Sequence, residues 1–462
     1  MAQEFNPNDQ LIRKYEQMVE NQSIGFFEEE ELEQIADYYI NQRQFQKAID
    51  VAELGKRIHP FNALFPVIHA QILVSKGENR VALELLEEAE RLDPFFGDIY
   101  MVRGNIFGQM GLQEKAIASY EKAREYDIPS VDVDFCCAFE YVNMGHIEKA
   151  IPLLKRVLME KPDHEAALND IAYCMEQLND HEKSISFFNR LTDKSPYNAN
   201  AWFYLGVAYS KCGLFEKAID AYDYALAIRE DFASALFNKA NALSMMNRLD
   251  ESIQTYQETL SIEENRADTH YYIGECYERK EQPEKALIHY NKAVRLDPNF
   301  GDAWLGIGII LENQNRIQEG IHYIKKAIDT DPENADYWYA YGDFQVKIGF
   351  QEEAEMAYRK VKELEPENIN IWLDYSNVLF DIGRIETALE ALQEGIKFHP
   401  QNADFYYRMS AYLMSAGRKQ EALSYLHDGL RLNFEKHNTL FEFLPQLKEN
   451  ENMNSIIESY RP

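Results

Sequence analysis

The chain has 462 residues, a formal net charge of −31 and a sequence pI near 4.8, and 46 % of its residues are hydrophobic. This apolar content excludes a disordered chain, and the length predicts several domains or an array of repeats. The strong negative charge argues against a nucleic-acid-binding protein and against binding to an anionic membrane surface, because both kinds of partner attract basic proteins.

Targeting features are not evident along the chain. Residues 1–8 contain no cationic stretch followed by an apolar run, and no segment approaches about 18 consecutive apolar residues. The five cysteines are an odd number and none belongs to a CxxC pair, which is typical of reduced thiols. We therefore expect a cytoplasmic protein without a membrane anchor.

Residues 1–28 are predicted to form a tail and a capping helix. Leu11, Ile12, Tyr15, Met18 and Val19 share one helical stripe within about residues 9–21. Such a helix would cover the apolar end of the segment that follows, and residues 3–9 would fray in front of it.

Residues 29–436 form twelve contiguous repeats of 34 residues, without an insertion or deletion. With Glu29 as position 1, position 8 is small in every repeat: Ala36, Ala70, Gly104, Ala138, Ala172, Gly206, Ala240, Gly274, Gly308, Gly342, Ser376 and Ser410. Around it, apolar residues recur at spacings of three and four in two segments of each repeat. This spacing predicts two helices per repeat, and the small residue lets them approach closely.

Two other positions predict where these helices end. Position 15 is glycine or asparagine in all repeats except those with Arg43 and Glu281, which indicates a left-handed residue after the first helix. Position 32 is proline in eight repeats, and proline cannot continue the second helix. Each repeat is therefore predicted to be a helix–turn–helix unit.

This pattern resembles the tetratricopeptide repeat, and the resemblance covers residues 29–436. It implies an all-α fold, a right-handed superhelical solenoid of about twelve helix–turn–helix repeats with capping helices in residues 1–28 and 437–462. At the C-terminal end, bulky Leu444 falls on position 8 and would prevent another close helix pair, so the array is expected to stop there.

The repeats leave little room for catalysis. The flanking segments are too short for a catalytic domain, and no phosphate-binding loop, dinucleotide-binding loop, HExxH or GxSxG motif is present. The histidines fall on unrelated repeat positions, with His270 predicted to pack and His289 predicted to be exposed. We expect no enzymatic activity, no cofactor and no metal site.

The resemblance implies that a partner binds on the inner surface, which is lined by positions 2, 5, 9, 12 and 13 of the first helices. Basic residues occupy these positions only at Lys211, Arg279 and Lys347, whereas acidic residues cluster in repeats 8–11 and aromatic residues in repeats 4–8. The candidate partner-binding residues are Phe135, Phe139, Tyr173, Phe203, Phe237, Asn241, Tyr271, Glu275, Glu278, Glu312, Tyr339, Asp343 and Asn377.

Two alternatives remain open for these residues. The aromatic residues at position 5 either anchor a ligand or pack against the adjacent first helix, and the acids either attract a basic partner or are merely solvated. The favoured function is a scaffold or adaptor that binds a peptide or protein segment, with basic and apolar residues, in the concave groove. The alternative is a substrate-recruiting subunit of an enzyme complex, such as a transferase, whose catalytic domain lies on another chain. The oligomeric state stays open.

Overall fold

A computed structural model describes residues 7–21, 25–126, 128–443 and 445–461. Residues 3–6 of the tail that we expected to fray, and Leu444, lie outside these ranges. The described residues form helices and no strands, which confirms the all-α fold. None of these helices is long and apolar enough to cross a membrane.

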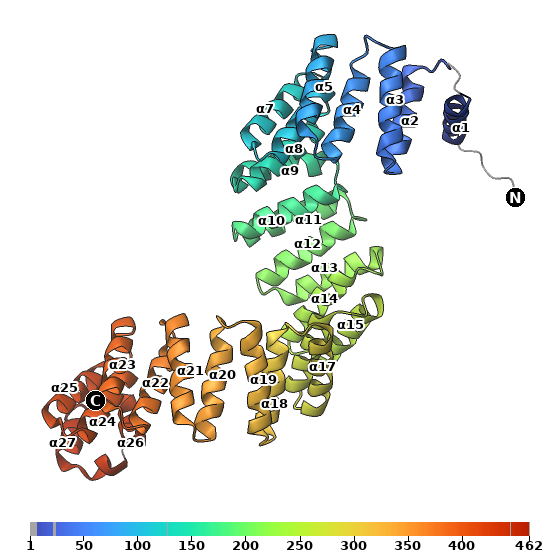
Figure 1. Ribbon diagram of the computed structural model, residues 1–462. Coiled ribbons are helices and arrows are strands. Elements are labelled where there is room, and N and C mark those ends of the chain that lie inside the picture. The colour runs from blue at the N-terminus through green and yellow to red at the C-terminus, as the bar shows by residue number, and fades with distance from the viewer. Residues whose placement is uncertain (1–6, 22–24, 127, 444, 462) are drawn as a thin grey trace. The chain divides into compact units, whose positions relative to one another are not determined.

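Each repeat contains one pair of helices (Figure 1). The first helices are α2 (Glu29–Asn41), α4 (Leu64–Ser75), α6 (Gly97–Gln109), α8 (Ser130–Asn143), α10 (Glu165–Gln177), α12 (Ala199–Lys211), α14 (Ala233–Met245), α16 (Ala267–Arg279), α18 (Gly301–Asn313), α20 (Ala335–Lys347), α22 (Ile369–Asp381) and α24 (Ala403–Ser415). The second helices are α3 (Phe45–Ile58), α5 (Asn79–Leu92), α7 (Gln113–Arg124), α9 (Ile147–Glu160), α11 (His181–Lys194), α13 (Phe215–Ile228), α15 (Leu249–Ile262), α17 (Pro283–Leu296), α19 (Ile317–Thr330), α21 (Gln351–Leu364), α23 (Ile385–Phe398) and α25 (Lys419–Leu432).

Short elements flank the repeats at both ends. Helix α1 (Pro7–Glu20) buries Ile12 and Tyr15 in one cluster with Leu32 and Tyr39 of the first repeat. After α25 come η1 (Phe434–Asn438), α26 (Thr439–Phe443), η2 (Pro445–Glu449) and α27 (Glu451–Ser459). Leu440, Met453 and Ile457 from this segment are buried in the cluster that also contains Leu430 of α25.

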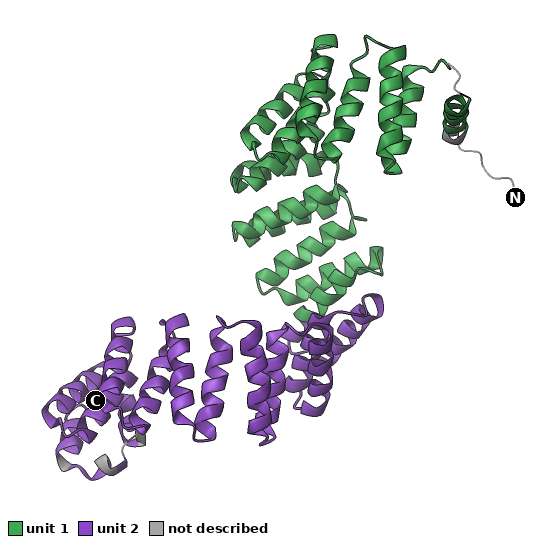
Figure 2. Cartoon of the chain, in the orientation of Figure 1, with its two compact units in different colours: residues 1–242 green, residues 243–462 purple. Residues whose placement is uncertain are grey.

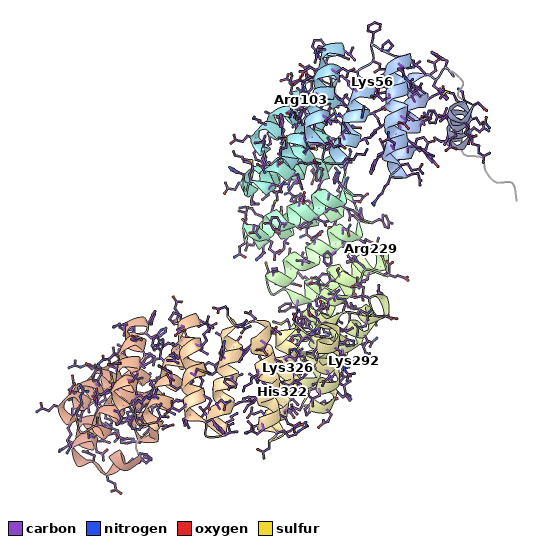
Figure 3. The ribbon with its side chains drawn as sticks, viewed as in Figure 1. Lys56, Arg103, Arg229, Lys292, His322 and Lys326 are labelled. Atoms are coloured by element: carbon purple, nitrogen blue, oxygen red, sulfur yellow. The ribbon has the colours of Figure 1, made fainter. Side chains whose placement is uncertain are left out.

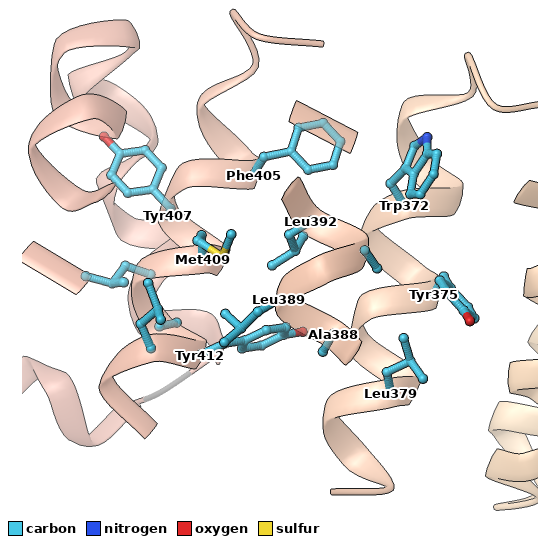
Figure 4. Packing of buried hydrophobic residues seen from close by; sticks show 14 of the residues in the cluster. Trp372, Tyr375, Leu379, Ala388, Leu389, Leu392, Phe405, Tyr407, Met409 and Tyr412 are labelled. Carbon is cyan, nitrogen blue, oxygen red and sulfur yellow. The ribbon is translucent and has the colours of Figure 1, made fainter. Parts of the chain in front are cut away.

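The chain divides into two compact units, residues 1–242 (unit 1) and residues 243–462 (unit 2), with the division inside α14 (Figure 2). Within each unit, buried side chains of consecutive repeats belong to the same clusters among the described residues. Figure 4 shows this in unit 2, where Leu392 of α23 lies among Trp372 of α22 and Phe405 and Met409 of α24. Stability therefore depends on contacts between neighbouring repeats.

The backbone confirms the turn predicted at position 15. All twelve residues at this position have a positive φ, including the two that are neither glycine nor asparagine, Arg43 and Glu281, each at 56°. A residue with a Cβ atom pays a steric cost in this left-handed region. Arg43 and Glu281 are therefore held there by the contacts of the two helices that they join.

We predict that Glu281→Gly stabilises the protein by about 0.5–1 kcal/mol, because glycine adopts this conformation without the steric cost. Urea unfolding followed by circular dichroism measures the change. Gly349→Glu is the matched reverse change, since the φ of Gly349 is 82° and no heavy atom lies within 4 Å of an added Cβ; it should destabilise by a similar amount. Equal urea midpoints for Glu281→Gly and the wild type would contradict the backbone strain at Glu281.

Candidate partner-binding surface

The two helices of several repeats meet where a glycine at position 8 faces a tyrosine at position 24. A Cβ atom on Gly206, Gly274 or Gly342 would lie 2.5 Å from the ring of Tyr222, Tyr290 or Tyr358, respectively. Gly104 and Tyr120 form the same contact. Glycine therefore gives each ring the space to lie directly against the first helix. Two repeats have only one member of this pair: repeat 7 has Tyr256 with Ala240, and repeat 9 has Gly308 with Ile324.

The hydroxyl groups of these tyrosines reach polar side chains at positions 9 and 12 of the first helix. The pairs are Tyr120 Oη to Asn105 Oδ1 (2.8 Å), Tyr222 Oη with Ser210 Oγ (3.2 Å), Tyr290 Oη to Glu278 Oε2 (2.7 Å), and Tyr358 Oη to Asp343 Oδ1. Positions 9 and 12 belong to the surface formed by positions 2, 5, 9, 12 and 13 of the first helices, which we call the first-helix surface. Buried tyrosines thus fix the orientation of polar groups on this surface.

This role of the position-24 tyrosines was not predicted from the sequence. The signal was available, because glycine at position 8 and tyrosine at position 24 occur together in repeats 3, 6, 8 and 10. Two of the sequence-predicted site residues, Glu278 and Asp343, are held in this way.

The predicted aromatic residues fall into two groups. Phe139 and Tyr173, both at position 9, keep 48 % and 49 % of their surface exposed. The rings at position 5 are half-buried and contact rings of their own repeat: Phe135 with His164 (4.5 Å between centroids), Phe203 with Phe232 (4.9 Å), Tyr271 with Phe300 (5.1 Å) and Tyr339 with Tyr358 (5.6 Å). Packing therefore engages the position-5 rings, and the position-9 rings project further into solvent. Phe237 and Asn241 lie half-buried on α14.

Two hollows lie on the first-helix surface of unit 1. The larger, which we call the α4–α6–α8 cavity, has a volume of about 620 Å³. Its lining includes Gln71, Val74, Asn105, Phe135, Phe139 and Glu140. The smaller, the α10–α12 cavity, has a volume of about 190 Å³ and is lined by Tyr173, Phe188 and Tyr204, among others. Each hollow therefore places one half-exposed aromatic ring beside polar groups.

The three basic residues of the first-helix surface already have partners on the preceding repeat. Lys211 Nζ lies 2.8 Å from Glu176 Oε1, and Lys347 forms an ion pair with the predicted site residue Glu312. Arg279 donates to Ser244 Oγ (2.8 Å) and to Asn247 Oδ1 (3.1 Å). These residues connect neighbouring repeats. Arg279 and Lys347 also lower the pKa of Glu275 and of Asp343, respectively, but by less than burial raises it.

Basic residues elsewhere also serve the structure. In unit 1, Arg103 Nη2 lies 2.6 Å from Glu90 Oε2, and Lys56 Nζ lies 3.1 Å from Glu88 Oε2. Figure 3 labels Arg103 and Lys56. The hydrogen bond from Arg103 lowers the pKa of Glu90 to about 2. Such pairs keep Lys and Arg engaged with acids outside the predicted site.

The acids of the first-helix surface in unit 2 carry an electrostatic cost. Burial is the main cause that raises the pKa of Glu275, and the carboxylates of Glu278 and Asp302 add to the shift against a hydrogen bond from Tyr271. Burial also raises the pKa of Asp343 and of Asp381, and Asp343 is further repelled by Asp374. The Nδ2 of Asn377 lies 3.4 Å from Asp381 Oδ2. A cation near these acids would relieve the cost.

The expectation that His289 is exposed is wrong. Its ring is half-buried because position 23 of the repeat, which lies on α17, faces α16, and its Nδ1 lies 3.2 Å from Nδ1 of His270. Burial, with His270 and Lys292 nearby, lowers the pKa of His289 to about 4, so both rings are neutral at pH 7. In the part of the chain that the structure describes, no group of three or more His, Cys, Asp or Glu residues is arranged to hold a metal.

Most of the repeats match models of one known protein family. Family models described as tetratricopeptide repeat match residues 69–128, 142–202, 199–232, 233–266, 267–300, 305–369 and 374–431. No curated protein matches the chain.

Three of the solved structures that match this chain are weakly similar to it. The APC/C hetero-tetramer Cut9–Hcn1 is 13 % identical with a TM-score of 0.42, over 90 % of this chain and 97 % of that chain. MamA is 24 % identical with a TM-score of 0.34, over 36 % and 98 %. YrrB, described as a TPR protein with an unusual peptide-binding site, is 22 % identical with a TM-score of 0.33, over 40 % and 95 %. These scores are too low to compare binding sites.

We predict different effects of removing the two kinds of aromatic ring. Phe203→Ala should destabilise by about 2–3 kcal/mol, because the ring packs against Tyr222 and Phe232. Phe139→Ala should cost less than about 1 kcal/mol, because half of its ring surface is already in water. Urea unfolding of both variants measures the difference, and equal losses would contradict the distinction between positions 5 and 9.

We also predict that Glu275→Gln raises the melting temperature at pH 7. The pKa of Glu275 in the folded protein is above its ordinary value of 4.5. The folded state therefore loses stability as the pH rises from that ordinary value through the pKa of the folded protein. The substitution removes that loss, and its benefit should disappear below about pH 4.

Glu319→Gln is the control for this experiment. The exposed carboxylate of Glu319 accepts hydrogen bonds from Arg316, which lowers its pKa, so its substitution should bring no gain at pH 7. A lower melting temperature of Glu275→Gln than of the wild type at pH 7 would contradict the electrostatic cost that we assign to the buried carboxylate of Glu275.

Proposed function

Because the chain belongs to the tetratricopeptide repeat family, we propose that it is a protein-interaction scaffold whose first-helix surface binds a peptide or protein segment. Its family and its helical architecture support a role in protein–protein interaction. The proposed role requires no catalytic group on this chain. It requires a surface with exposed anchors, oriented polar groups and hollows that receive side chains.

The observation that carries the proposal is the position of Phe139 and Tyr173. Both rings are half-exposed, both lie at position 9 of adjacent repeats, and each lines a hollow. Aromatic rings that are partly exposed beside a hollow are typical of interface hot spots. The apolar part of a partner would therefore contact repeats 4 and 5.

The polar groups around these rings favour an extended ligand. Tyr120 donates to Asn105 Oδ1, which leaves the Nδ2 group of Asn105 to donate to a carbonyl group of a bound chain. The side chain is held in place before binding, so little conformational entropy is lost when the ligand arrives.

In unit 2, the same surface favours a partner with basic residues. Glu275, Asp343 and Asp381 have raised pKa values, and the lysine and arginine residues of this surface already contact neighbouring repeats. A lysine or arginine of the partner would stabilise these carboxylates. Such charge complementarity contributes mainly to the association rate and to specificity.

We predict that peptides selected on the full chain from a phage-displayed random dodecapeptide library bind through these two rings. The double variant Phe139→Ala/Tyr173→Ala should weaken a selected synthetic peptide at least about tenfold in fluorescence anisotropy, since each ring is a hot-spot candidate. Val81→Ala is the control, because Val81 is an exposed apolar residue on the second helix α5 of unit 1. Equal affinity of both variants for the selected peptides would contradict the proposed surface.

A further inference from the structure

Glu140 stands at a repeat position that carries no charge anywhere else. Position 10 of the other repeats is Tyr38, Ile72, Ile106, Cys174, Ala208, Ala242, Cys276, Ile310, Phe344, Val378 and Tyr412. Glu140, in the middle of α8, is nevertheless buried, with 3 % of its surface exposed. A carboxylate at such a position destabilises the fold unless a cation or several hydrogen-bond donors compensate for its burial.

A second unusual residue makes room for Glu140. Gly108 is the only glycine at position 12 in the twelve repeats, and it lies on the preceding first helix, α6. A Cβ atom at this residue would lie 2.4 Å from Glu140 Oε1. Glycine inside a helix costs about 1 kcal/mol relative to alanine. Two residues that are each locally unfavourable therefore meet in the lining of the α4–α6–α8 cavity.

The surroundings do not compensate for the charge of Glu140. Its Oε2 atom is buried and has no hydrogen-bond partner among the described residues. Burial raises the pKa of Glu140, and a side-chain hydrogen bond from Asn143 only opposes this shift. Glu140 lines the α4–α6–α8 cavity, whose lining contains no lysine, arginine or histidine.

The rest of the cavity suits the stem of a long side chain. Val74, Val102, Phe135 and Phe139 supply apolar surface, and the polar residues of its lining other than Glu140 carry no charge: Gln71, Ser75, Asn105, Gln109, Tyr120 and Cys136. Lysine and arginine combine an apolar stem with a cationic head. A neutral donor would satisfy one lone pair of the carboxylate but would leave its charge unbalanced.

We propose that the α4–α6–α8 cavity is a specificity pocket for a lysine or arginine of the bound segment, whose cationic group pairs with Glu140. This inference rests on the proposed function, because it names one side chain of the ligand that the first-helix surface would bind. Val74, Val102 and Phe139 contact the stem of that side chain, and Glu140 selects its charge. The pocket lies in repeats 2–4, apart from the acids of unit 2 in the sequence.

The test uses the full chain and the same phage-displayed random dodecapeptide library. Peptides enriched on the wild type should contain a lysine or arginine at a constant distance from an apolar residue. A synthetic peptide from this set should lose affinity at least about tenfold on Glu140→Gln, which keeps the shape of the side chain and removes the charge. Glu148→Gln, an exposed residue of α9, is the charge-matched control and should leave the affinity unchanged.

A second measurement examines the pairing on the unaltered protein. Replacing the lysine of the peptide by norleucine keeps an apolar stem and removes the cation, and it should cost about the same factor as Glu140→Gln. The two changes together should cost little more than either alone, because they remove the same interaction. The melting temperature of Glu140→Gln should equal or exceed that of the wild type, because the variant no longer buries a charge.

The possible results separate the two proposals. Enriched peptides without a constant basic residue, or an unchanged affinity for Glu140→Gln, would overturn the specificity pocket. The proposed function would stand in that case if the same peptides still depended on Phe139 and Tyr173. Failure to enrich any peptide on the full chain would overturn both.

Discussion

The close approach of two helices at position 8 is the constraint on which the other features depend. A small residue there lets a side chain from position 24 lie directly against the first helix, as Tyr222 does against Gly206. Helices of this length gain most of their stability from such packing rather than from their own hydrogen bonds. Where the side chain is tyrosine, the same contact also brings a hydroxyl group to the first-helix surface. Packing within a repeat thus determines the orientation of groups that a partner would contact.

Features that depend on local backbone geometry could be predicted from the sequence. The turn at position 15 is the clearest example, because even Arg43 and Glu281 adopt the left-handed conformation that glycine favours at the equivalent positions. Features that depend on a particular neighbour could not. Phe203 is half-buried because the ring of Phe232 packs against it, whereas Phe139 keeps about half of its surface in water. A position in the repeat does not contain that information.

The same reason explains why the sequence did not single out Glu140 and why the predicted exposure of His289 was wrong. Position 10 is apolar or aromatic in the other repeats, so the repeat frame did not mark Glu140 as a surface residue. Its space comes from Gly108, which is 32 positions away in the sequence and belongs to the preceding repeat. His289 is likewise defined by its contact with His270. Departures from the repeat pattern become informative when they are compared in pairs across adjacent helices.

The invariant turn at position 15 also bears on how such a chain changes during evolution. Because every repeat leaves its first helix through the same left-handed residue, one repeat can follow another without a new connection. An in-frame duplication or loss of a whole repeat therefore preserves the geometry of each junction and changes only the length of the array. A substitution at a single position of one repeat, such as residue 140, acts by contrast within a local neighbourhood. Length and specificity can consequently be selected independently of each other.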